Sequence, residues 1–260
     1  MGVACLLGCK EELCMAIRWE LSVKFLEQGN IFFFYKPKKG VEEVKEFEDV
    51  GRFYFVLDPY GEKQIRFVVM GQKKMPSVTD GHERAWGFIE KVGGRGFMVS
   101  SKQKVVSVSG NARPVGEGLY AIIHHIDHTH LVYVLELPRK LGEVQKAFNI
   151  ERQANYIFII KHPNTPLPPG ALLPSSKGEP KNENFIKEFG TRKYIPVNPP
   201  SLLDYEGAMV FMIGVNDELA KLGIQVNKDI ETEGSADIFQ ELKMSKKRHP
   251  IEPLMKGTWK

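Results

Sequence analysis

Four of the seven histidines in this 260-residue chain fall within one run of seven residues, His124–His130, which reads HHIDHTH. Imidazole nitrogens bind zinc and similar metals, and they also exchange protons near neutral pH. No other part of the sequence gathers as many groups that could bind a metal or carry a proton. The run lies between two segments with strand character, so we interpret it as the tip of a β-hairpin.

A two-residue tip would place three of these histidines on one face of the hairpin. His125 would then face His128, and His130 would lie two residues farther along the same face. Opposed side chains are about 5 Å apart, which is close enough to share a divalent transition metal. The candidate metal ligands are therefore His125, His128 and His130, with Asp127 orienting a ligand or acting as the catalytic base. Surface or hydrogen-bonding histidines are the simpler alternative, because Ile126-Asp127 is poor chemistry for such a turn.

The separation of His124 and His130 resembles that of two histidines in the phosphoesterase module of bacterial DNA-repair ligases, where the second histidine leads into a strand. The resemblance implies metal-dependent hydrolysis of phosphoesters. The acidic and basic positions of that module are Val132 and Val134 here, and neither can bind a metal or a phosphate. The metallo-β-lactamase pattern His-x-His-x-Asp-His is excluded, because Ile123 stands where its first histidine is required.

A second group of candidate residues lies in the last part of the sequence. Residues 243–260 carry six lysines or arginines and one glutamate, so their balance is +5, and subtracting it from the total of +4 leaves −1 for the other residues. Lys246, Lys247 and Arg248 are candidate contacts with nucleic-acid phosphates, and a solvated helix end is the alternative. A nearly neutral body is not typical of a dedicated nucleic-acid-binding fold. Trp259 is expected on a surface or at an interface.

Common catalytic motifs are absent from the sequence. There is no Gly-x-Ser-x-Gly nucleophile motif, and the run Gly93–Gly96 between two strand-like segments is typical of a turn rather than of a phosphate loop. The only cysteines, Cys5, Cys9 and Cys14, match no zinc spacing, and their role is left open. The lack of a disulfide framework and of an apolar run of about 18 residues favours a cytoplasmic protein without a membrane span.

The elements that must position these residues are mostly strands. Runs rich in Val, Ile, Phe and Tyr recur after Gly29 at intervals too short for crossover helices, which predicts a largely antiparallel sheet, a sandwich-like or barrel-like meander. The aromatic residues 32–35 are expected to divide between two buried faces of one strand. Apolar residues spaced four apart predict an N-terminal helix over about residues 10–28. Strands are predicted near residues 31–35, 53–57, 65–70, 85–92, 96–99, 105–108, 119–124, 129–137, 156–160 and 208–215.

The expected architecture is a single α+β domain over residues 1–260. A β-rich body spans residues 29–162, and a connection at 163–200 holds more than half of the sixteen prolines, as a linker or a packed surface loop. The segment 201–260 has too little apolar surface to fold alone, so we expect it to pack on the body with two short C-terminal helices. Those helices are predicted at residues 217–222 and 235–244.

These patterns favour a non-catalytic cytoplasmic protein that binds a macromolecular partner, with nucleic acid preferred over a protein partner. The preference depends on the basic residues near position 247 and on the missing catalytic motifs. The alternative is a metal-dependent, phosphoesterase-like hydrolase that uses the histidine run. A third hypothesis is an assembly component that docks on a neighbouring subunit through its proline-rich and basic segments.

Overall fold

A computed structural model describes residues 23–80, 83–94, 112–167, 169, 171, 178–216, 242 and 250–259. Most of these residues lie in β-strands. The strands are β1 (Val23–Pro37), β2 (Val50–Pro59), β3 (Gln64–Met70), β4 (Arg84–Gly94), β5 (Arg113–His125), β6 (His128–Leu137), β7 (Gln153–Lys161), β8 (Tyr194–Pro196) and β9 (Met209–Gly214). The helical segments are η1 (Phe47–Asp49), α2 (Glu143–Ala147), α3 (Glu183–Lys187), η3 (Pro200–Asp204) and α5 (Glu252–Lys256).

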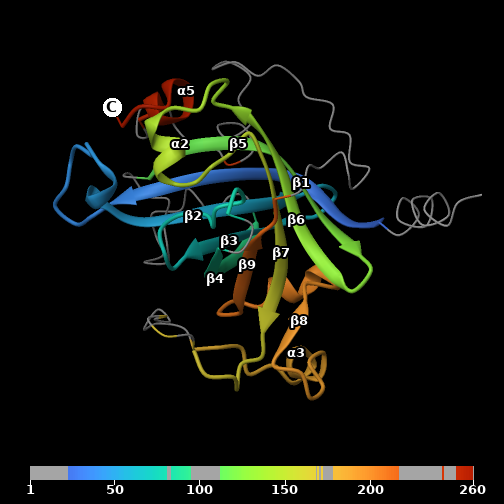
Figure 1. Ribbon diagram of the computed structural model, residues 1–260. Helices are drawn as coiled ribbons and strands as arrows, with labels where there is room; N and C mark the ends of the chain where they lie inside the picture. Colours follow the sequence, from blue (N-terminus) through green and yellow to red (C-terminus); the bar gives the residue numbers. More distant parts are fainter. Residues whose placement is uncertain are drawn as a thin grey trace, which may run out of the picture.

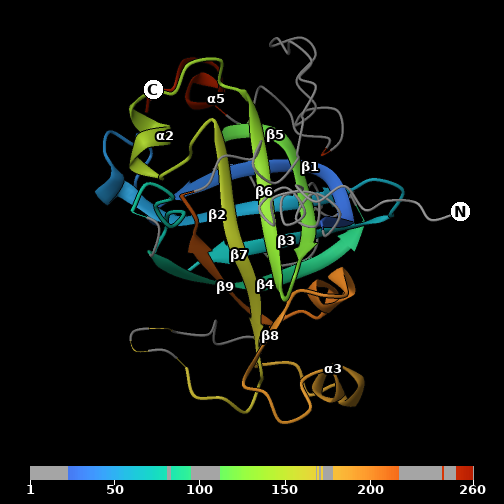
Figure 2. The same cartoon turned by 45° about the vertical axis from the view of Figure 1, so that its right-hand side comes forward.

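Eight of the nine strands close into an antiparallel barrel (Figures 1 and 2). The order around the barrel is β6-β5-β1-β2-β3-β4-β9-β7, and β7 pairs with β6 to complete the ring. Strands β1 to β4 form a meander, β5 returns to pair with the other edge of β1, and β9 is inserted between β4 and β7. Strand β8 extends the sheet from β7, outside the ring, near α3 (Figure 2). Closure removes the free edges that an open sheet would expose.

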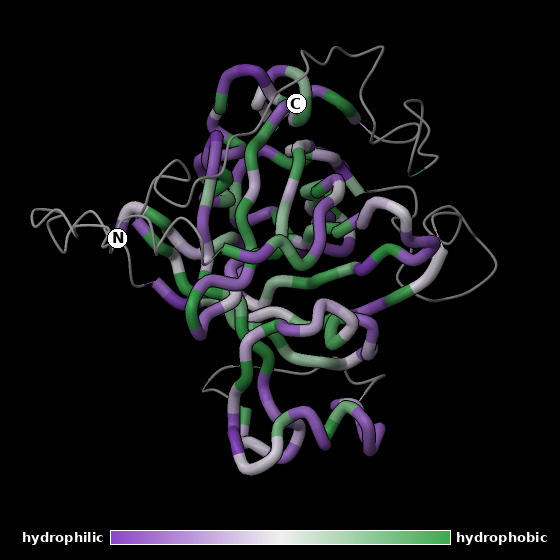
Figure 3. The backbone as a smooth tube through the Cα atoms, turned by 90° about the vertical axis from the view of Figure 1, so that its right-hand side faces the viewer, coloured by the Kyte–Doolittle hydropathy of each residue, from purple (hydrophilic) through white to green (hydrophobic). Residues whose placement is uncertain are grey.

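Alternating side chains fill the barrel and cover part of its outside. Phe33 and Tyr35 of β1 belong to the interior cluster, whereas Phe32 and Phe34 belong to a second buried cluster on the outer face. The ring of Phe33 lies 5.1 Å from that of Tyr133 on β6, so aromatic rings occupy the space between strands. Hydrophobic residues recur along the barrel strands (Figure 3). The division of residues 32–35 between two buried faces is thereby confirmed.

The predicted α+β class is wrong, because the described chain is mostly strand. Its α-helices are three segments of five residues each. Residues 23–28, predicted as the end of an N-terminal helix, form the start of β1 and pair with β5, beginning at Val23 opposite His125. Ladder hydrogen bonds and a shared apolar face outweigh a helical spacing that is only weakly favourable. The rest of that predicted helix lies outside the described residues, and the largely antiparallel sheet is confirmed.

The predicted strands that fall within the described residues all overlap observed strands. The predicted strands at 96–99 and 105–108 lie outside the described residues. So do the predicted helices at 217–222 and 235–244, apart from Leu242, which packs in the outer cluster. None of the described helices is long and apolar enough to cross a membrane.

The described part of the proline-rich connection is anchored by buried side chains, although many of its other residues are exposed. Its residues Phe185, Phe189 and Val197 are fully buried and belong to the interior cluster. The buried Lys161 at the end of β7 donates hydrogen bonds to carbonyls of the following loop and forms an ion pair of 2.9 Å with Glu179. The described part is therefore a packed surface segment rather than a free linker.

Candidate functional site

The histidine run forms the tip of the β5–β6 hairpin. His125 pairs with His128 across the two-residue turn, and Ile126 adopts a φ of 56°, the left-handed conformation that such a turn requires. The ring centroids of His125 and His130 are 6.2 Å apart, and those of His128 and His130 are 6.5 Å apart. The three imidazoles therefore lie near one another, in the geometry that a two-residue tip predicts.

The same three imidazoles are not arranged as a ready set of metal ligands. The Nδ1 atom of the buried His130 lies 2.8 Å from Oδ1 of Asn155, in a hydrogen bond that fixes its ring. The side chains of His128 and Asp127 are 54% and 76% exposed and lie 3.3 Å apart. No group of three or more His, Cys, Asp or Glu side chains within the described ranges is placed to hold a metal ion.

The other sequence candidates lead to no site that the structure describes. Lys246, Lys247 and Arg248 lie outside the described residues, as do the three cysteines. Trp259 is described and is buried, with its ring 5.6 Å from that of Tyr35. The expected surface position of Trp259 is therefore wrong, because the chain folds back to cover one end of the barrel interior.

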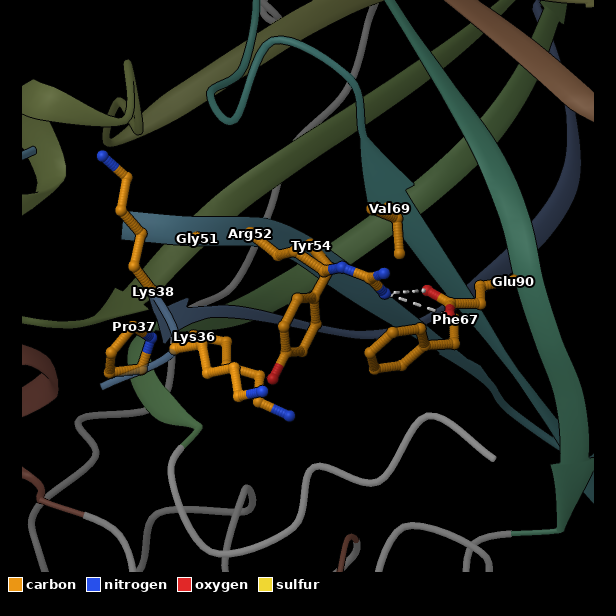
Figure 4. A pocket seen from close by; sticks show the side chains of 10 residues that line it. Lys36, Pro37, Lys38, Gly51, Arg52, Tyr54, Phe67, Val69 and Glu90 are labelled. Atoms are coloured by element: carbon orange, nitrogen blue, oxygen red, sulfur yellow. Dashed lines mark hydrogen bonds and ion pairs between the residues drawn. The ribbon is translucent and has the colours of Figure 1, made fainter. Parts of the chain in front are cut away.

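A pocket that the sequence analysis did not identify lies on the outer face of β1, β2, β3 and β4 (Figure 4). We call it the basic pocket. Its volume is about 410 Å³. Four cationic side chains, an aromatic and apolar floor and one carboxylate line it. These residues are Lys36, Pro37, Lys38, Lys39, Gly51, Arg52, Tyr54, Phe67, Val69 and Glu90.

The register between β1 and β2 brings the cations together. Lys36 pairs with Arg52 across the two strands, although sixteen positions separate them in the sequence. The register then shifts between Lys36 and Pro37, at the end of β1. Gly51 permits the close approach of the strands here, because an added Cβ would lie only 2.8 Å from the backbone oxygen of Pro37.

Most of the positive charge of the basic pocket has no ion-pair partner in the part of the chain that the structure describes. Arg52 donates hydrogen bonds of 3.2 and 3.3 Å to the two oxygens of Glu90, whose side chain is only 8% exposed. Lys36, Lys38 and Lys39 form no ion pair with any of the described residues. Among the described residues, three ammonium groups of the pocket therefore have no carboxylate partner, whereas Arg52 and Glu90 pair with each other.

The hydroxyl of Tyr54 is a buried donor in the same pocket. Tyr54 is 3% exposed, and its ring packs 4.4 Å from Phe67 and 5.5 Å from Phe34, measured between centroids. Burial raises the pKa of Tyr54 well above its ordinary value; Glu90 adds to this effect and Arg52 opposes it. The hydroxyl therefore keeps its proton, yet it makes no hydrogen bond with a described residue. Figure 4 shows that Lys36 extends in the same direction as this hydroxyl, whereas Lys38 points away from it.

A smaller pocket of about 260 Å³ lies at one end of the barrel, and three of its charged side chains, Glu27, Arg66 and Asp204, already pair with one another. Arg66 donates to both carboxylate oxygens of Glu27, at 2.6 and 2.7 Å, and to Asp204 at 2.7 Å. The hydroxyl of Tyr120 donates to Glu27 at 2.8 Å. This network holds η3 to the barrel, so we interpret it as structural.

The chain matches no family model, no curated protein and no solved structure. Its function therefore has to be inferred from the chemistry of the basic pocket. Glu90 is the only carboxylate among the described residues that line this pocket, and it is held by Arg52. The described lining of the pocket thus offers cations and a hydroxyl donor, which are groups suited to binding an anion.

Proposed function

We propose that this protein is a non-catalytic binding protein for nucleic acid, and that the basic pocket binds its phosphate groups. The observation that carries the proposal is the set of three lysines that line the basic pocket without an ion pair to any described residue, of which Lys36 extends in the same direction as the hydroxyl of Tyr54. Lysine ammonium groups attract phosphates as point charges, and hydroxyl groups donate hydrogen bonds to phosphate oxygens. The basic residues Lys246, Lys247 and Arg248 stay a second candidate contact for the same ligand.

The alternative, a metal-dependent hydrolase at the β5–β6 hairpin, has less support. The ring of His130 is already committed to Asn155, and His128 and Asp127 pair with each other in solvent. A hydrolase would need several ligands that converge on one ion, with an open position for substrate. The basic pocket already gathers four cationic side chains, so binding is the function we favour.

The proposal predicts how strongly the binding constant for nucleic acid depends on salt concentration. Each cation that neutralises a phosphate of a single strand adds about 0.7 to the negative slope of log K against log salt concentration. Three lysines therefore give a slope of about −2. Reversing the charges of Lys36 and Lys39 removes two of these contacts and leaves a slope of about −0.7 or weaker.

Fluorescence anisotropy with a labelled single-stranded oligonucleotide tests this. Between about 50 and 200 mM salt, the wild-type protein should bind with the slope of −2, and Lys36→Glu/Lys39→Glu should bind at least tenfold more weakly at the lower salt concentration. The control Lys181→Glu/Lys187→Glu changes two exposed lysines around α3 by the same total charge and should leave binding unchanged. Salt-independent binding, or equal loss in both double variants, would contradict a role for the basic pocket.

A further inference from the structure

We infer that Glu90 is a positioning residue of the basic pocket, and that it holds the guanidinium of Arg52 in place to bind a phosphate group. This inference rests on the proposed function and makes it more specific, because it adds an oriented arginine to the three lysines. It uses a bulge in β4, the hydrogen bonds between the two side chains, and the donors that Arg52 keeps.

A β-bulge in β4 places Glu90 at the basic pocket. Two successive residues of β3 pair with Lys91 and Ile89, so Glu90 is an extra residue that the register between β3 and β4 skips. Ile89 and Val92 both pack in the interior, whereas Glu90 lines the pocket on the outer face. Bulges often lie beside functional sites, where they re-aim a side chain. This bulge directs a carboxylate toward Arg52, which lies two strands away on β2.

The contact between Arg52 and Glu90 holds the arginine through one of its nitrogens. Both carboxylate oxygens of Glu90 accept from Nη1 of Arg52, at 3.2 and 3.3 Å (Figure 4). The Glu90 side chain is 8% exposed, whereas that of Arg52 is 52% exposed. The buried carboxylate therefore restricts the rotamers of a long side chain that would otherwise move in solvent.

Arg52 keeps donors for a ligand while it is bound to Glu90. A guanidinium carries five N–H donors in a planar fork, and phosphate oxygens accept from such a fork in pairs. The Nε and Nη2 atoms of Arg52 make no hydrogen bond with any described residue. Arg52 lines the basic pocket beside the lysines, so a phosphate there lies within reach of these donors. Binding then costs less ordering, because Glu90 has restricted Arg52 in advance.

The test keeps every charge and changes only geometry. Glu90→Asp keeps the carboxylate but shortens its reach, and Arg52→Lys keeps the positive charge but removes the fork. Anisotropy with the same labelled single-stranded oligonucleotide compares the wild type, the two single variants and the double variant. Each single variant should bind about fivefold more weakly, with the salt slope still about −2. The double variant should bind no more weakly than Arg52→Lys, because a lysine has no fork to position.

Glu206→Asp is the matched control. It shortens the carboxylate of a neighbouring ion pair, 3.0 Å from Lys91 and outside the basic pocket, and it should leave the affinity unchanged. Wild-type or tighter binding by Glu90→Asp would overturn the inference and leave the proposed function standing, and so would additive losses in the double variant. No binding by the wild-type protein would overturn both.

The Nε–H signal of Arg52 gives a readout that a loss of stability does not imitate. It should shift when the oligonucleotide is added to the wild-type protein, and an unchanged signal at saturation would overturn the inference. If Glu90→Asp melts well below the wild type, Glu90→Gln replaces it. Glu90→Gln should weaken binding when Arg52 is present but tighten it in the Arg52→Lys background, where only the lost negative charge acts. Tighter binding in both backgrounds would overturn the inference.

Discussion

Replacing Arg66 with Met should destabilise the barrel strongly, because it breaks a buried ionic network. The Arg66 side chain is 5% exposed and that of Glu27 is 11% exposed. Burial lowers the pKa of Arg66, but Glu27 and Asp204 raise it by more, so the guanidinium is charged at every practical pH. Without Arg66, the hydroxyl of Tyr120 is the one side-chain partner that Glu27 keeps among the described residues.

The expected loss follows from the uncompensated charge that remains. Removing one partner of a buried pair costs about 3–5 kcal/mol. The contribution of Asp204 is discounted, because its side chain is 36% exposed and solvent screens it. The lower part of the range, about 3 kcal/mol, is therefore expected for Arg66→Met. A domain of ordinary stability has about 5–15 kcal/mol in total, so the change is large.

Urea unfolding of four proteins measures this effect: the wild type, Arg66→Met, Glu27→Gln and the double variant. The double variant should be more stable than Arg66→Met alone, because a neutral amide replaces the stranded carboxylate. Strictly additive effects would show that the two side chains do not interact. A loss below about 1 kcal/mol for Arg66→Met would refute a buried ion pair of this strength.

Three further predictions concern the barrel. Burial raises the pKa of five tyrosines, namely Tyr35, Tyr54, Tyr120, Tyr133 and Tyr156. The stability that these tyrosines contribute is fully present below their unfolded pKa of about 10 and is lost as the pH rises above it, by about 1 kcal/mol per tyrosine between pH 10 and 11. Tyrosinate absorbance should therefore rise together with unfolding. Ionisation of all five tyrosines in a protein that stays folded would contradict this. Gly118→Ala should cost about 2 kcal/mol or more in urea unfolding, because its Cβ would lie 2.1 Å from the backbone oxygen of Val134. The control Gly178→Ala meets nothing within 4 Å and should be nearly neutral. Lys161→Met should cost about 3 kcal/mol by leaving Glu179 unpaired, and adding Glu179→Gln should recover part of it; no recovery would show that the ion pair is not the cause.

Local patterns in the sequence predicted much of the sheet but did not decide between a sandwich-like and a barrel-like arrangement. The aromatic run 32–35 is buried on two faces, and the histidine run forms the tip of a hairpin. Both features could be predicted, because each depends on neighbouring residues in the chain or on the next strand. Closure depends on the return of β5 to β1 and on the insertion of β9 between β4 and β7. Such non-local pairings leave no local periodicity. The helical spacing that ends at Phe25 is overridden by the β5 ladder for the same reason.

The basic pocket was missed because a net charge averages over position. The body of the chain is nearly neutral, yet Lys36, Lys38 and Lys39 follow one another at the end of a strand. Arg52 joins them only through the β1–β2 register. The short run Lys36–Lys39 was the sequence feature that could have indicated an anion-binding site. It indicates a pocket only once Tyr54 is known to line the same surface. The burial of Trp259 likewise depends on a tertiary contact, with Tyr35.

The most direct test of the central claim is to locate the ligand by backbone amide chemical shifts, recorded while a single-stranded oligonucleotide is added to the isotope-labelled protein. Binding in the basic pocket predicts shifts concentrated at residues 36–39, 51–54 and 90, with the β5–β6 hairpin unchanged. Shifts concentrated at His125, His128 and His130, or no shifts at residues 36–39 when the oligonucleotide is saturating, would contradict the account.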